Sequence, residues 1–178
     1  MLKMKKSFLL SACLISVLTF FSCGEKKPKP VYIDIADVES PIASGNIVKV
    51  PYTEMYGVKT ISVKINGVPM NMIYDTGCSG VHLSLLELQT LCKNGQFSEN
   101  DIIGSSYSSI ADGNIVENGL VNLRKIEIGG ENGITLYNVE ASVALNQEAP
   151  VLLGNGVFDS MASVELDNYN KTINFKKK

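Results

Sequence analysis

The sequence has few of the residues that metal sites, cysteine proteases and nucleic-acid-binding surfaces need. Its 178 residues include one histidine and four cysteines, and tryptophan is absent. One histidine and scattered acids give no metal-ligand spacing, and no basic stretch is interleaved with aromatic residues, as a nucleic-acid-binding face requires. A Cys-His catalytic pair would have to join Cys78 to His82, and these lie roughly 13 Å apart in an extended segment. We therefore expect no metal, no cofactor and no nucleic-acid partner.

The composition indicates one turn-rich globular domain. Hydrophobic residues make up 45% of the chain, which also has 15 glycines and 6 prolines. The length leaves room for a single domain with a sizeable core. The formal net charge is −2, and the first 22 residues carry three lysines and no acid. The remainder therefore has 13 basic and 18 acidic residues, a net charge of −5.

The first 22 residues are typical of a secretory signal peptide. Lysines near the start are followed by an apolar run from Phe8 to Phe21, which is too short for a comfortable membrane span. The run ends at Phe20-Phe21-Ser22-Cys23, which resembles a bacterial lipobox with Cys23 as the lipidated residue. A plain cleaved signal or an uncleaved anchor is the alternative, and either would also place the domain outside the cytoplasm.

Residues 23–45 are predicted to be a lipid-anchored, flexible tether. The stretch from Gly24 to Pro30 is polar and contains prolines, so it cannot pack a core. Multiple acylation at Cys23 would make the membrane anchoring stable. We expect a protein of the bacterial cell envelope that faces the periplasm or the exterior, with its folded domain over residues 46–178.

Regular strand patterns begin at residue 47 and lead to a hairpin. Ile61, Val63 and Ile65 alternate with polar residues, which predicts a half-buried strand over residues 60–65. Asn66-Gly67 favours a tight hairpin turn because both residues tolerate positive φ. The return strand over residues 70–74 ends at Asp75. A carboxylate at the end of a buried strand needs a compensating partner or a shared proton.

A helix and several more strands are predicted after this hairpin. Ser84 and Glu87 have the spacing of a capping box, and Gly95 marks the expected end of the helix. Ser98 and Asp101 suggest one more helical turn. Further strands are expected over residues 105–110, 114–128, 136–145, 151–154, 164–167 and 172–175. Many short strands and one clear helix predict an all-β fold, either a small closed barrel or a sandwich.

The order of these features resembles that of the retropepsin-like aspartic proteases. Tyr74-Asp75-Thr76-Gly77-Cys78-Ser79-Gly80 is similar to the catalytic turn of the family, with the hairpin before it and the capped helix after it. Residues 107–114 resemble the flap, and Leu152-Leu153-Gly154 resembles the segment that packs under the catalytic turn. The resemblance covers about residues 47–175 and suggests a bacterial single-domain member. It implies a small closed β-barrel with one or two short helices.

The resemblance implies an aspartic endopeptidase that acts on a peptide or protein substrate as a homodimer. Such enzymes use two carboxylates that share one proton, so that one activates water while the other donates to the scissile carbonyl. This chain has one Asp-Thr-Gly sequence. A second subunit would therefore supply the other carboxylate across a two-fold axis.

The roles that the resemblance implies fall on two short segments. In the first, Asp75 would be the catalytic carboxylate, Thr76 would hydrogen-bond across the dimer, and Gly77 would let its N–H approach Asp75. The flap tip at Ala111, Asp112 and Gly113 would close over an extended peptide. Strands near residues 172–175 would contribute to the dimer sheet.

Two alternatives stay open at the level of sequence. A non-catalytic, lipid-anchored peptide-binding protein could use the same barrel without turning over its ligand. Cys78 and Cys92 could form a disulfide in an oxidising compartment, although both also suit small, buried apolar positions.

Overall fold

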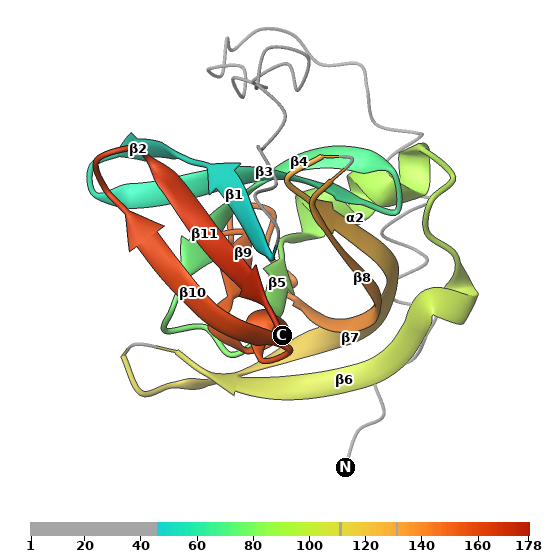
Figure 1. Cartoon of the computed structure of the whole chain (residues 1–178). Helices are drawn as coiled ribbons and strands as arrows, with labels where there is room; N and C mark the ends of the chain where they lie inside the picture. The colour runs from blue at the N-terminus through green and yellow to red at the C-terminus, as the bar shows by residue number, and fades with distance from the viewer. Residues whose placement is uncertain (1–45, 111, 131) are drawn as a thin grey trace, which may run out of the picture.

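The structure, a computed structural model, describes residues 46–110, 112–130 and 132–178 (Figure 1). The predicted signal peptide, the tether up to residue 45 and the flap residue Ala111 lie outside the described residues. Strands dominate the described ranges, which hold a single α-helix and two short 3-10 helices. The prediction of an all-β fold is confirmed. None of the described helices has the length and apolar character needed to cross a membrane.

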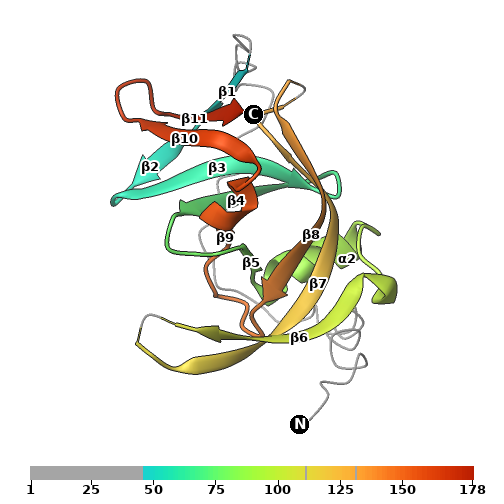
Figure 2. The ribbon, with the colours of Figure 1, turned by 60° about the horizontal axis from the view of Figure 1, so that its bottom comes forward.

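Eight strands of the described residues form one sheet, most of which closes into a barrel (Figures 1 and 2). They are β2 (Thr53–Met55), β3 (Val58–Ile65), β4 (Val68–Asp75), β5 (Val81–Leu83), β6 (Ile102–Ser109), β7 (Ile115–Ile128), β8 (Ile134–Val143) and β9 (Leu152–Gly154). The hydrogen-bonded order is β2-β3-β4-β9-β5-β8-β7-β6, and β7 also pairs with β3. This last pairing closes the ring, with β2 and β6 as appended strands. The predicted barrel is therefore present.

A second sheet has three strands in the order β1-β11-β10. They are β1 (Ile47–Pro51), β10 (Met161–Asp167) and β11 (Thr172–Lys177). Strand β11 contains the residues expected in the dimer sheet, but β1 and β10 occupy both of its edges. Within the described residues β11 therefore has no free edge, and the contribution of the terminal strands to a dimer sheet stays a prediction. The outer edges of β1 and β10 remain for such a contact.

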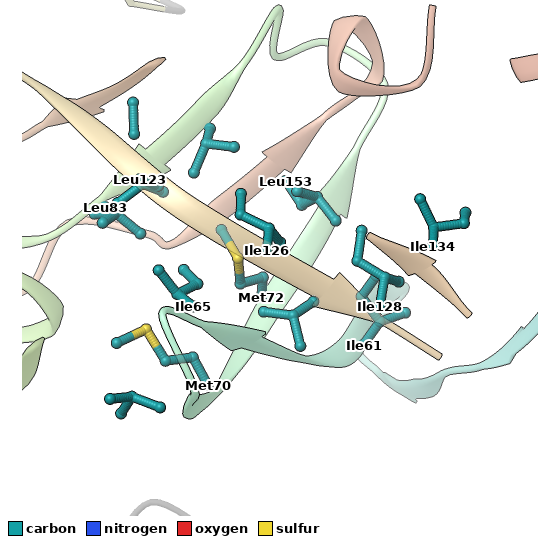
Figure 3. Close-up of a cluster of buried hydrophobic side chains, with 14 of the residues drawn as sticks. Ile61, Ile65, Met70, Met72, Leu83, Leu123, Ile126, Ile128, Ile134 and Leu153 are labelled. Atoms are coloured by element: carbon teal, nitrogen blue, oxygen red, sulfur yellow. The ribbon is translucent and has the colours of Figure 1, made fainter. Parts of the chain in front are cut away.

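The barrel interior is filled by branched and sulfur-containing side chains from facing strands. Ile61, Val63 and Ile65 are all at most 2% exposed, as their alternation predicts. Figure 3 shows Ile61 and Ile65 in one cluster with side chains from β4, β5, β7, β8 and β9, among them Met72 and Leu153. Fully burying one such side chain stabilises the fold by about 1.5–3 kcal/mol. The alternation that the sequence displays thus decides which face of β3 lines the core.

The turn at Asn66-Gly67 ties the hairpin to the rest of the barrel. Asn66 and Gly67 have φ values of 50° and 86°, as the sequence pattern predicts. The Asn66 side chain donates to the carbonyl of Gln96 over 2.9 Å and accepts from the N–H of Lys125 over 2.9 Å. One buried side chain therefore links the β3–β4 turn to β7 and to the segment after the helix.

The helix α2 (Leu85–Lys93) begins and ends where the sequence indicates. Ser84 is its N-cap, and the reciprocal capping box with Glu87 is present. Gly95, with φ of +66°, follows the C-cap residue Asn94. Leu88 and Leu91 are fully buried against the barrel. The second predicted turn is the 3-10 helix η2 (Glu99–Asp101), which also has a capping box between Ser98 and Asp101.

Candidate active site

Asp75 lies at the end of β4, at the start of a tight loop that we call the Asp75 turn (residues 75–80). Its carboxylate accepts a hydrogen bond from the Gly77 N–H over 2.8 Å. A side chain at position 77 would place its Cβ 3.2 Å from the same carboxylate oxygen, which is a tight contact. Asp75 is half-buried, whereas Thr76 and Gly77 are exposed. The turn therefore fixes one carboxylate oxygen through a backbone donor.

The last residue of strand β9 and the residue after it hold the Asp75 turn through backbone hydrogen bonds. The N–H groups of Gly154 and Asn155 donate to the carbonyls of Gly80 and Cys78 over 2.8 and 2.9 Å. Asp75 is also the register partner of Gly154 in the parallel pairing of β4 with β9. Two backbone carbonyls of the turn thus have hydrogen-bond partners, and any movement of the turn would have to break these bonds.

Two glycines make this close approach possible. A Cβ at Gly154 would lie 2.5 Å from the Gly80 carbonyl oxygen and closer still to that of Cys78. A Cβ at Gly156 would collide with the carbonyl oxygen of Ser79. Gly154 belongs to the segment that the sequence comparison with retropepsins singled out. Gly156 was not predicted, although a second glycine two residues later is the signal that could have revealed it.

Tyr74, immediately before the Asp75 turn, contacts the segment that follows β9. Its hydroxyl donates to the Asn155 side-chain oxygen over 3.4 Å, and its ring lies 6.2 Å from that of Phe158. Partial burial raises the pKa of the Tyr74 phenol. Phe158, in the 3-10 helix η3 (Asn155–Phe158), also packs on Phe175 of β11 with ring centroids 4.5 Å apart. The turn is therefore connected to the second sheet through aromatic contacts.

Cys78 carries a free thiol within the turn. Its Sγ donates to the Gly80 carbonyl over 3.3 Å, and the side chain is half-buried. A disulfide between Cys78 and Cys92 is therefore not formed. This agrees with Cys78 acting as a small packing residue in the turn.

His82 follows the turn on β5 and contacts the neighbouring strand β8. Its Nδ1 lies 2.7 Å from Ser142 Oγ on the neighbouring strand β8. Burial lowers the pKa of His82 below its ordinary value of 6.5. The described residues contain no group of three or more His, Cys, Asp or Glu side chains placed to hold a metal ion.

The predicted flap is the hairpin of β6 and β7. At its tip the Gly113 N–H donates to the Ile110 carbonyl over 2.8 Å, and Gly113 has φ of +85°. Asp112 accepts from the backbone N–H and the side-chain amide of Asn114 over 2.9 and 2.8 Å. Asp112 thus shapes the tip. Both ribbon views place this tip on the same side of the barrel as the loop between β4 and β5 (Figures 1 and 2).

Comparison with known proteins was made on sequence and on fold. The sequence matches a family model described as "Aspartyl protease" over residues 61–157, which is more than half of the chain. The fold is similar to the crystal structure of a retropepsin-like aspartic protease from Rickettsia conorii, with a TM-score of 0.52 and 17% sequence identity. That match covers 74% of this chain and 90% of the other. No curated protein sequence matches the chain.

We predict that Gly154→Ala destabilises the protein by about 3 kcal/mol or more, because the added methyl group overlaps carbonyl oxygens that cannot move independently. Urea unfolding measures this change. Gly104→Ala is the matched control, since a Cβ there meets nothing within 4 Å, and it should not reduce stability. Equal losses in the two variants would show that the turn is not tightly supported.

We predict that His82 makes stability fall as the pH drops through about 6.5. Its pKa is depressed in the folded state, so the unfolded chain takes up a proton first, near pH 6.5. The stabilisation is complete above the unfolded pKa and declines towards the folded pKa. The slope of unfolding free energy against pH should flatten in His82→Gln, while most carboxylates titrate below this range. An unchanged slope would contradict this assignment.

Proposed function

Because the chain belongs to the aspartyl protease family and has a retropepsin-like fold, we propose that it is an aspartic endopeptidase that acts as a homodimer. The observation that carries this proposal is the Asp75 turn. The half-buried Asp75 carboxylate accepts a hydrogen bond from the Gly77 N–H, and the loop that carries it is held by backbone hydrogen bonds from Gly154 and Asn155. Catalysis needs such a fixed carboxylate, because a general base must lie within hydrogen-bond reach of its water.

The chemistry we propose needs two copies of Asp75. Like charges about one water apart cannot both ionise, so the pair would hold one proton and titrate as a coupled system. One carboxylate would accept a proton from the water that attacks the scissile carbonyl. The other would donate its proton to the developing oxyanion. Thr76, which is exposed beside Asp75, would hydrogen-bond with the second subunit.

A second subunit is proposed because the chain has one Asp-Thr-Gly sequence. Within the described residues, β1 and β10 each pair on one side, with β11. Their outer edges carry unpaired backbone groups that could add a strand from another chain. We propose that these edges, rather than β11 itself, contribute to the dimer contact.

The flap would close over the substrate. A peptide bound as an extended strand would lie between the Asp75 turn and the tip at Ala111, Asp112 and Gly113, and closure would exclude water. The hydrogen bonds from Asn114 to Asp112 give the tip a defined shape. A small, pre-shaped tip loses less entropy when it closes.

We predict that Asp75→Asn lowers kcat/KM for an unstructured peptide at least about 100-fold, since it removes the general base and acid. Glu140→Gln, which changes an exposed carboxylate on β8, is the control and should retain activity. Cleavage of a peptide library at mildly acidic pH measures both. Unchanged hydrolysis by Asp75→Asn would contradict the catalytic role of Asp75, whereas no hydrolysis by wild type would leave the alternative of a non-catalytic peptide-binding protein.

Mixing the two forms tests whether the site is shared. At fixed total concentration, an equal mixture of wild type and Asp75→Asn should retain about one quarter of the wild-type activity, because random pairing makes one dimer in four fully wild type. Independent monomers would retain about one half. The second result would contradict the homodimer and leave the protease assignment intact.

We further propose that Cys23 is lipidated and holds the protein in the bacterial cell envelope, facing the periplasm or the exterior. The support is the sequence alone, through the lipobox-like Phe20-Phe21-Ser22-Cys23 and the polar tether over 23–45. We predict that the full chain expressed in bacteria incorporates labelled palmitate, and that Cys23→Ala does not. Equal labelling of both forms would contradict this site, and labelling of neither would contradict the lipoprotein assignment.

A further inference from the structure

Two hairpin turns of the described residues carry large apolar side chains that lie almost fully in solvent. In the turn between β2 and β3, Tyr56 is 96% exposed, and its neighbours Met55 and Val58 are 71% and 42% exposed. In the turn between β10 and β11, Tyr169 is 94% exposed. We call Met55, Tyr56, Val58 and Tyr169 the tip residues. None of them contributes to the buried core.

The two turns are joined to each other by polar contacts. Lys171 Nζ lies 2.8 Å from Glu54 Oε2. The backbone N–H of Tyr52 donates to the Lys171 carbonyl over 2.9 Å, and the Tyr52 hydroxyl donates to the Asn168 side-chain oxygen over 3.1 Å. Both ribbon views show the two turns close together on one side of the molecule (Figures 1 and 2). The tip residues therefore belong to one surface.

The backbone conformation of Tyr56 is unfavourable for a tyrosine. Tyr56 and Gly57 have φ values of 52° and 79°, nearly those of Asn66 and Gly67 in the next hairpin, at 50° and 86°. Asparagine tolerates this left-handed conformation, whereas a bulky side chain rarely adopts it. Because Tyr56 is so exposed, no burial offsets this cost in the free protein. A partner that covers the side chain would offset it.

The strand register places Met55 and Val58 on the same face of the sheet as Asp75. Thr60 of β3 is the register partner of Ile73 of β4. Two residues farther along, β3 starts at Val58 and β4 ends at Asp75. Directly opposed residues of an antiparallel pair point to the same face, and Met55 is in turn the partner of Val58. These two tip residues therefore share both the edge and the face of the sheet at which Asp75 lies.

This placement favours a second copy of the chain as the partner. Two Asp75 carboxylates can share a water only if the surface around each Asp75 turn faces the other subunit. A membrane lying on the tip residues would occupy the side from which that second subunit must approach. A buried aromatic side chain removes about 150–250 Å² from water, so the four tyrosines of a dimer would bury about 600–1,000 Å². A stable interface buries about 1,200–2,000 Å².

We propose that the tip residues form the apolar part of the contact between two copies of this chain. The inference rests on the proposed homodimer and assigns the surface that holds it together. The outer edges of β1 and β10 would supply backbone hydrogen bonds, while the tip residues supply buried apolar area. Tyrosine is enriched in such contacts because its ring is apolar and its hydroxyl can still reach water or a polar group.

The test compares Tyr56→Asn, Tyr169→Asn and the double variant with Tyr137→Asn. Tyr137 on β8 is 68% exposed, but its register partner Lys125 contacts Asn66, at the opposite end of β3 from Val58. Sedimentation equilibrium of the full chain in detergent gives the dissociation constant of the dimer. Each tip variant should raise this constant about 10- to 100-fold. The double variant should raise it further, and Tyr137→Asn should leave it unchanged.

Two further measurements separate a dimer contact from a structural role and from peptide binding. Tyr56→Asn should be at least as stable as wild type in urea unfolding of the monomer, because asparagine suits a φ of 52° better than tyrosine does. Peptide hydrolysis by this variant should be lost at low protein concentration and return as the concentration exceeds the new dissociation constant. A raised KM in the fully dimeric variant would assign Tyr56 to the peptide and overturn the inference.

Other outcomes would also overturn the inference. These are an unchanged dissociation constant in the double variant, or an equal increase in Tyr137→Asn. Both leave the proposed protease in place, provided that wild type dimerises and cleaves peptides. A wild type that stays monomeric at high concentration would instead overturn the homodimer on which this inference rests.

Discussion

Strand β9 holds the Asp75 turn because it lies between the two strands that the turn connects. It pairs parallel to β4 on one side and antiparallel to β5 on the other. The turn must therefore pass over the end of β9, and the glycine at that end gives the backbone room to do so. The position of Asp75 thus depends on backbone pairing between segments almost eighty residues apart, which side-chain substitutions elsewhere disturb little.

The sequence predicted local structure correctly wherever a turn conformation or a hydrogen bond involves only residues a few positions apart. Asn66-Gly67 makes its turn with two residues of positive φ, and Ser84 with Glu87 satisfies the first N–H groups of the helix. The pairing of strands could not be predicted in this way. Three apolar residues such as Leu152 to Gly154 suggest a buried strand, but nothing in them says that β4 and β5 are its neighbours. The central place of β11 was missed for the same reason.

The sequence predicted those parts of the site whose contacts form within one short motif. Asp75 with Gly77 is such a motif, since a glycine amide beside a carboxylate gives the observed 2.8 Å hydrogen bond. The contact of Tyr74 with Asn155 was not predicted, because these residues meet only through β9. The burial of Asn118 was missed for another reason. A serine-rich strand is typical of an exposed edge, whereas Asn118 is 1% exposed.

The two parts of the proposed site differ in how their polar groups are satisfied. Around Asp75, the carbonyls of Gly80 and Cys78 accept hydrogen bonds from Gly154 at the end of β9 and from Asn155 after it, and these bonds keep the turn that carries the carboxylate in place. In the β6–β7 hairpin a buried hydroxyl has no partner among the described residues. A buried hydroxyl without a partner, here that of Ser106, costs about 1–3 kcal/mol. The hairpin therefore carries a local cost that the backbone hydrogen bonds around Asp75 avoid.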